Sequence, residues 1–206
     1  MGKHAQSIDS QVLRRAKTGK AGWVFTASDF LDLGSRDAVD TALFRHLRNG
    51  AIRKITRGLY DIPRQDVQMG QLAPSVDAIA KAIQDRDAIR LQPSGAYAAN
   101  LLGLSNQVPM KIVFLTDGSP RRMQVGKLQI ILRRTTPRNM ATAGKVSGLI
   151  IQALRHLGQH GIGTRETAIL RQRLTTDDRQ QLLKDARFAP AWIARVMRDV
   201  AGSAKD

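Results

Sequence analysis

Apolar residues recur at helical spacing in three stretches near the N-terminus. The first stretch, residues 7–17, carries an apolar stripe and stops before a glycine. In the second, residues 26–34, a threonine followed three residues later by an aspartate has the capping-box spacing. The third runs over residues 36–49 behind Ser35, a residue type that caps helices. Its predicted core face follows the i, i+3, i+4, i+7, i+8 pattern and consists of Val39, Ala42, Leu43, His46 and Leu47.

A two-stranded hairpin is expected directly after the third helix. The segments AIRKI and LYDI alternate apolar and polar residues, and the tripeptide TRG at 56–58 separates them with a turn. An Asn-Gly pair ends the helix before the hairpin, and Pro63 ends the hairpin. Three short helices followed by a hairpin is the order of a winged helix-turn-helix. The sequence therefore predicts such a DNA-binding domain over residues 1–63.

The rest of the chain mixes strands and helices. Residues 64–74 (RQDVQMGQLAP) are predicted to be a linker. A helix follows from Ser75, then the strand AIRLQ, the helix GAYAANLLG and three strands, of which KIVFL has the strongest pattern. Amphipathic stretches after Gly144 predict four closing helices. We therefore expect an α+β protein, in which an α+β domain with a small, mostly antiparallel sheet and C-terminal helices occupies residues 75–206.

The chain is strongly basic, with 33 Lys and Arg against 17 Asp and Glu and a net charge of +16. Residues 1–63, 64–140 and 141–206 each carry eleven Lys and Arg, against six, five and six acids, so folded surface must carry the charge. Such a field attracts nucleic acid, an acidic protein or an anionic membrane. Nucleic acid is the commonest of these partners, and an acidic protein is its chief competitor.

The same composition predicts a cytoplasmic protein. The N-terminal residues lack the apolar core of a signal peptide, and no apolar run is long enough to cross a bilayer. The chain has no cysteine, so it offers neither a disulfide framework nor a thiolate metal site.

No pattern typical of a catalytic, cofactor or metal site stands out. The GxxxxGK[ST] and GxSxG motifs are absent, and no convincing GxGxxG occurs. The chain has one glutamate, Glu166, and the pair Asp177-Asp178 fits the first turn of a helix better than a carboxylate dyad. His156 and His160 have the spacing of two metal ligands, but no third ligand accompanies them. We expect no cofactor, no metal and no enzymatic activity.

The third predicted helix and the hairpin carry the candidate DNA-binding residues. In a winged helix, the N-terminal half of this helix enters the major groove and the hairpin lies along phosphates. Arg36 can bind guanine through two hydrogen bonds, and Asp40 can accept from cytosine N4. Phe44 can touch a thymine methyl, although packing on a neighbouring element is favoured. The residues placed for phosphate contacts, each with a solvated surface charge as the alternative, are Arg45, Arg48, Arg53, Lys54 and Arg57.

Two motifs in the chain resemble AbiEi-type antitoxins. The run SRDAVDTALFRHLRNGAIRKITRGLYDIP (35–63) is similar to the winged helix of that family in its small-apolar helix, its G-x-I-R-K/R strand and its R-G-L-Y turn. The run LQPSGAYAANLLGLSNQVPMKIVFLTDG (91–118) resembles the second domain of the family's shorter bacterial members. Carried onto this chain, the resemblance implies DNA contacts at Ser35, Arg36, Thr41, Arg45, Arg53, Lys54 and Arg57.

The resemblance also implies a function in a type IV toxin-antitoxin system. The N-terminal domain would bind inverted repeats of double-stranded DNA in its own promoter and repress the operon. The second domain would counteract a nucleotidyltransferase-like toxin, with or without direct contact. Two alternatives stay open, namely a basic adaptor that binds an acidic partner protein and an RNA-binding protein.

Overall fold

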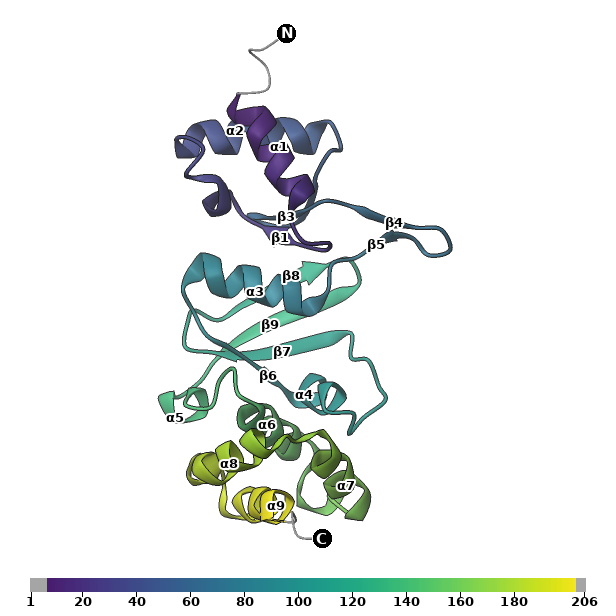
Figure 1. Ribbon diagram of the computed structural model, residues 1–206, viewed down its shortest axis with the longest axis vertical. Coiled ribbons are helices and arrows are strands. Elements are labelled where there is room, and N and C mark those ends of the chain that lie inside the picture. Colours follow the sequence, from purple (N-terminus) through teal and green to yellow (C-terminus); the bar gives the residue numbers. More distant parts are fainter. Residues whose placement is uncertain (1–6, 203–206) are drawn as a thin grey trace. The chain divides into compact units, whose positions relative to one another are not determined.

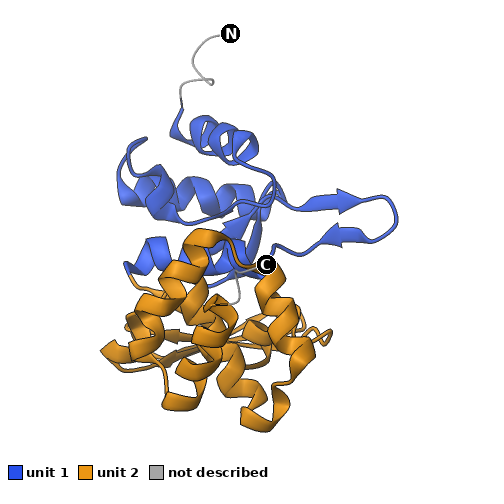
Figure 2. Ribbon diagram, turned by 60° about the horizontal axis from the view of Figure 1, so that its bottom comes forward, with its two compact units in different colours: residues 1–88 blue, residues 89–206 orange. Residues whose placement is uncertain are grey.

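The computed structural model describes residues 7–202, which form two compact units (Figures 1 and 2). Unit 1 ends at Ala88, and unit 2 begins at Ile89. Helices and strands occur in both units, which confirms the predicted α+β class.

Unit 1 consists of short elements (Figure 1). In chain order they are α1 (Ile8–Thr18), β1 (Val24–Phe25), the 3-10 turn η1 (Ala27–Phe30), α2 (Arg36–Arg48), β2 (Arg53–Thr56), β3 (Leu59–Asp61), β4 (Arg64–Asp66), β5 (Gly70–Leu72) and α3 (Val76–Asp87).

Serine hydroxyls begin all three α-helices of unit 1. Ser7, Ser35 and Ser75 each accept a hydrogen bond from the backbone N–H three residues later, at 3.2, 3.3 and 3.1 Å. This bond satisfies one of the backbone donors that a helix N-terminus leaves without an intrahelical partner. The helix starts that the sequence predicted at these serines are therefore confirmed.

Two antiparallel sheets lie in unit 1. The first has the strand order β1-β3-β2, so the middle strand β3 pairs with both neighbours. The second is the separate hairpin β4-β5, whose turn exposes the apolar side chains of Val67 and Met69. Packed between the helices and the first sheet is an apolar core that includes Val12, Phe25, Phe30, Val39 and Leu43.

Three sequence-based expectations about this part of the chain differ from the structure. The second predicted helix is a single 3-10 turn. The Asp29 carboxylate accepts from both the N–H and the hydroxyl of Thr26, and the chain soon reaches the next helix cap, Ser35. Residues 64–74, predicted as a linker, contain the hairpin β4-β5. Helix α3, predicted to open the second domain, belongs to unit 1.

Unit 2 combines one sheet with a helical cluster. Its elements are β6 (Leu91–Ser94), α4 (Gly95–Leu101), β7 (Lys111–Thr116), β8 (Arg121–Val125), β9 (Leu128–Arg134), α5 (Pro137–Met140), α6 (Val146–Leu157), the 3-10 turn η2 (Gln159–Gly161), α7 (Thr164–Arg173), α8 (Thr176–Asp185), the 3-10 turn η3 (Ala186–Phe188) and α9 (Ala191–Gly202).

The sheet of unit 2 has the order β6-β7-β9-β8. The β6-β7 and β8-β9 pairs are antiparallel, and the central pair β7-β9 is parallel. Helix α6 approaches one face of the sheet closely, since a Cβ at Gly148 would collide with the Thr142 carbonyl oxygen and with Gln92 Oε1. On the same face, the Ser94 hydroxyl donates to Gln152 Oε1 at 3.3 Å.

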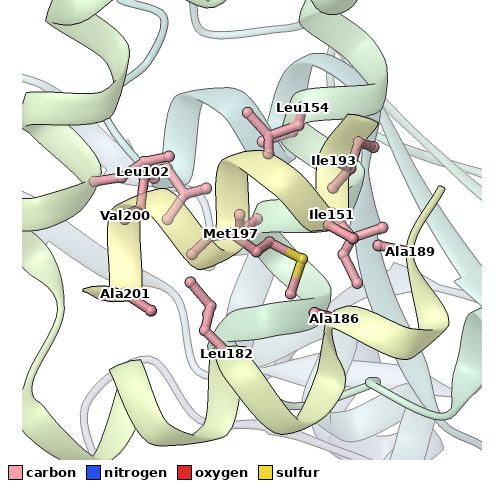
Figure 3. Close-up of a cluster of buried hydrophobic side chains, with 14 of the residues drawn as sticks. Leu102, Ile151, Leu154, Leu182, Ala186, Ala189, Ile193, Met197, Val200 and Ala201 are labelled. Atoms are coloured by element: carbon pink, nitrogen blue, oxygen red, sulfur yellow. The ribbon is translucent and has the colours of Figure 1, made fainter. Parts of the chain in front are cut away.

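The helices of unit 2 share an apolar core (Figure 3). Met197 of α9 lies among Ile151 of α6, Leu182 of α8 and Ile193, and all four side chains are buried. A buried polar link joins two of these helices, since the Ser147 hydroxyl of α6 donates to Asp185 of α8 at 2.6 Å. Gln181 and Lys145 lie beside the same carboxylate, at 2.8 and 3.5 Å. The pair is therefore satisfied and structural.

Ala88, at the C-terminus of α3, has φ = +50°, and the other described residues with positive φ are glycines. The left-handed conformation costs an alanine about 1 kcal/mol, which glycine avoids. We expect Ala88→Gly to raise the free energy of unfolding in urea by up to about 1 kcal/mol. The gain is reduced by the greater conformational entropy that glycine gives the unfolded chain. Ala168→Gly in the middle of α7 is the matched control and should lower stability by about 1 kcal/mol. A loss of stability in both variants would contradict the expectation.

Candidate nucleic-acid interface

Helix α2 separates its apolar and polar side chains onto two faces. Val39, Ala42, Leu43 and His46 are buried, as the spacing predicted, and Leu47 is half-buried. The opposite face is exposed to solvent and carries the residues Ser35, Arg36, Asp37, Asp40, Thr41, Phe44, Arg45 and Arg48. We call this set the α2 face. Every candidate residue that the sequence placed on this helix therefore lies on one accessible surface.

Contacts with α1 fix the position of α2. The buried His46 side chain places Nε2 at 2.9 Å from the backbone oxygen of Asp9 and 3.5 Å from its carboxylate. Arg45 lies 4.0 Å from the same carboxylate on the exposed side. At the other end of α1, Arg15 forms two hydrogen bonds with Asp32, which raise the pKa of the guanidinium and lower the pKa of the carboxyl. These polar contacts hold α1, α2 and the segment between them in one arrangement.

The N-terminal half of the α2 face carries an ion pair. Arg36 Nε donates to Asp40 Oδ2 at 2.8 Å, one helical turn away, and both side chains are more than half exposed. Burial raises the pKa of the Tyr60 hydroxyl on β3, the negative charge of Asp40 raises it further, and the positive charge of Arg36 lowers it.

The C-terminal half of the α2 face pairs an arginine with an aromatic ring. Phe44 is 59% exposed, and the Arg48 guanidinium lies over its ring, 5.9 Å from the centroid. The favoured expectation that Phe44 packs on a neighbouring element is therefore wrong. The cause is its position on the helix, because Phe44 follows the buried Leu43 directly and points away from the core.

Arg53 differs from the other predicted phosphate-binding residues. Its Nε and Nη2 donate to the two carboxylate oxygens of Asp61 at 2.9 and 2.5 Å, and Nη2 also donates to the Leu72 carbonyl at 2.9 Å. Asp61 is only 2% exposed. Because side chains alternate along a strand, Arg53 and Lys54 point to opposite faces of β2. Arg53 therefore joins the central strand β3 to the hairpin β4-β5, and its role is structural.

Lys54 and Arg57 remain exposed on the hairpin β2-β3. Lys54 lies directly opposite Tyr60 in the antiparallel register, so both side chains stand on one face of the sheet. Arg57 occupies the turn between the strands, followed by Gly58 with φ = +72°. The Arg57 carbonyl accepts from Arg86 of α3 at 3.1 Å, which anchors the turn while its side chain stays accessible.

The alternation of LYDI predicted the strand that carries Tyr60, but it gave no indication that the charges of Asp40 and Arg36 would influence the pKa of this side chain. The arrangement has the elements needed to contact a duplex, namely two possible base readers, an exposed aromatic ring and cations that flank them.

The two units share the positive charge unequally. Residues 1–88 contain fourteen Lys and Arg against ten Asp and Glu, a net charge of +4. Residues 89–206 contain nineteen against seven, a net charge of +12. The excess of positive charge, which is uniform over the three sequence segments, therefore lies mainly in unit 2.

The structure offers no metal site among the residues that it describes, since no group of three or more His, Cys, Asp or Glu side chains comes together there. His156 lies in the last turn of α6 and His160 in η2. Asp178 accepts from the Thr175 N–H and hydroxyl at 3.1 and 2.8 Å, as a helix-capping residue does.

A family model described as "Family of unknown function (DUF6088)" matches residues 11–182. The chain belongs to this family. No curated protein matches the DUF6088 chain in sequence. Its structure is similar, with a TM-score of 0.44 and 15% identity, to the crystal structure of the RV2827C protein from Mycobacterium tuberculosis, over 96% of this chain and 77% of that one. A likeness this weak carries no information about what the DUF6088 chain binds.

Between residues 7 and 202, no helix combines the length and the apolar character needed to span a membrane.

Replacing Arg53 should destabilise unit 1. Arg53→Met leaves the buried Asp61 carboxylate without its charged partner, and we expect the free energy of unfolding in urea to fall by about 3 kcal/mol. The double variant Arg53→Met/Asp61→Leu removes both charges and should lose less than Arg53→Met alone. Lys54→Met, one residue away on the opposite face, is the matched control and should change stability by less than about 0.5 kcal/mol. Equal losses for Arg53→Met and Lys54→Met would show that the ion pair is unimportant.

Proposed function

We propose that the chain is a sequence-specific DNA-binding regulator whose unit 1 is a winged helix-turn-helix. The order α1, β1, η1, α2, β2, β3 supports this proposal, as does the pairing of β1 with β3 beside the hairpin. In this scheme α2 is the recognition helix and β2-β3 is the wing. The observation that carries the proposal is the α2 face, an accessible helix surface with polar, charged and aromatic side chains, opposite a buried face that is apolar except for His46.

Arg36 and Asp40 would read bases in the major groove. An arginine that forms two hydrogen bonds with guanine must be held extended. The 2.8 Å hydrogen bond that Arg36 Nε donates to Asp40 restricts the guanidinium before DNA binds. Asp40 then either accepts from cytosine N4 or orients Arg36. Ser35 and Thr41 lie on the same surface, within reach of the same groove, and the exposed ring of Phe44 can contact a thymine methyl.

Arg45, Arg48, Lys54 and Arg57 would bind phosphates. Each is exposed, and none is held by a short ion pair, since the Arg45–Asp9 distance is 4.0 Å. Arg53 is excluded from this set because its guanidinium is engaged by Asp61 and Leu72. Four such contacts imply a slope of about −3.6 for log K against log salt from unit 1 alone.

The wider role that we propose is that of an AbiEi-type antitoxin in the cytoplasm. Unit 1 would bind inverted repeats in its own promoter, and unit 2 would counteract a nucleotidyltransferase-like toxin. The support for this role is the resemblance of residues 35–63 and 91–118 to that family. A second candidate, a basic adaptor for an acidic partner protein, is favoured by a different observation, the net charge of +12 on unit 2.

Selection from a pool of random DNA duplexes tests the DNA-binding proposal. The full chain should enrich a defined sequence. Arg36→Ala should lose the preference at one base pair, a change worth about 1–3 kcal/mol, because a bidentate base contact disappears. Arg57→Ala should bind all sequences more weakly and reduce the salt slope by about 0.9, because one phosphate contact is lost.

Leu183→Ala provides a control for the selection, because Leu183 is an exposed residue of α8 in unit 2 and should leave sequence preference unchanged. Failure of the wild-type chain to enrich any sequence would rule out a sequence-specific regulator.

Co-expression with the product of the neighbouring gene tests the antitoxin role. If the two functions are separate, the full-length double variant Arg36→Ala/Arg57→Ala should still restore growth in the presence of a nucleotidyltransferase-like toxin while it no longer binds the selected DNA. A neighbouring gene without a nucleotidyltransferase signature, or a toxin that the wild-type chain does not neutralise, would refute this role and leave the adaptor as the better proposal.

A further inference from the structure

Unit 1 contains a cavity of about 640 Å³ that lies away from the α2 face. Its walls come from the turn before β1, the start of η1, and one face of α3. The α3 wall is formed by residues spaced three or four apart, and its middle is occupied by two small side chains, Ala78 and Ala82, which leave the space open. The volume falls within the range of pockets that hold small organic ligands.

The charged groups around this cavity are not equivalent. Both acids have partners: Asp29 accepts from Thr26 at 2.7 and 2.9 Å, and Asp85 is paired with Lys81 at 2.9 Å. Arg86 is likewise engaged, by Asp87 at 2.8 Å. Lys81 therefore balances the charge of Asp85, whereas Asp29 is held by the uncharged N–H and hydroxyl of Thr26.

Two cations of the lining have no such partner. In the part of the chain that the structure describes, the side chains of Lys20 and Arg64 form no hydrogen bond or ion pair. The Arg64 guanidinium lies flat against the turn at Gly22, where its carbon stands 3.3 Å from the position that a Cβ would occupy. Arg64 is half-buried.

The rest of the lining combines apolar residues, among them Trp23 and Val24, with the hydroxyl-bearing residues Thr26, Ser28 and Ser75. Trp23 lines the cavity and belongs to an aromatic cluster, with ring centroids 5.1 Å from Phe25 and 5.9 Å from Phe30. An apolar floor with an indole on one side and two unpaired cations matches a ligand that has a flat apolar body and one negative group. We propose that this cavity binds a small aromatic anion, with Arg64 and Lys20 as the anion-binding residues and Trp23, Ala78 and Ala82 as the apolar contacts.

The dye 1-anilinonaphthalene-8-sulfonate, an aromatic sulfonate whose emission rises in apolar surroundings, is a suitable probe. The chain contains two tryptophans, so the full-length variant Trp192→Phe leaves Trp23 as the single donor for energy transfer to the dye. We expect saturable binding at one site with transfer from Trp23. Arg64→Ala should weaken binding at least tenfold, Arg64→Lys should weaken it less, and Ala78→Leu should abolish it by filling the floor.

Arg14→Ala, an exposed arginine of α1 outside the cavity, is the matched control and should leave the affinity unchanged. Thermal melting of each variant checks that it is folded. If Ala78→Leu does not fold, the affinities of Arg64→Ala and Arg64→Lys for the dye test the proposal without it. Dye binding without transfer from Trp23, equal affinity in Arg64→Ala and wild type, or no saturable binding would each overturn the proposal. No DNA enters this experiment, so its result is independent of the DNA-binding role.

Discussion

The buried carboxylate of Asp61 is the constraint on which unit 1 depends. A charge that is only 2% exposed must be paired, and Arg53 pairs it through two hydrogen bonds. Asp61 lies on the middle strand β3, and Arg53 also holds the Leu72 carbonyl, so one guanidinium ties both sheets of the unit together. The hairpin β2-β3 and the hairpin β4-β5 are therefore both held by the same ion pair.

Unit 2 is organised differently, around an apolar helical core and a sheet with a parallel central pair. Its polar interior is small and satisfied, as the Ser147–Asp185 bond illustrates. Among the described charged residues of unit 2, Asp185 is buried, and most of the net charge of +12 is therefore carried at the surface. A field of that size acts at long range and is screened by salt, whereas the contacts of the α2 face act at short range.

Local patterns predicted the starts of α1, α2 and α3 and the buried side of α2 well, because caps and periodicity are properties of neighbouring residues. Tertiary partners could not be predicted in the same way. Arg53 and Lys54 are adjacent cations in the sequence, and only the register with Asp61 separates a structural arginine from an exposed lysine. The short strands β4 and β5 carry no apolar alternation, so a linker was the natural expectation there.

Ser35 has a consequence for how relatives of this chain can diverge. Its hydroxyl caps α2 by accepting from the Ala38 N–H at 3.3 Å, and the residue also opens the α2 face. Only the few residue types that cap helices can replace it without loss of stability. Arg36, Asp40 and Thr41 carry no such structural duty. Substitutions at these three positions should therefore be tolerated more readily than at position 35, which should vary only among serine, threonine, aspartate, asparagine and glycine.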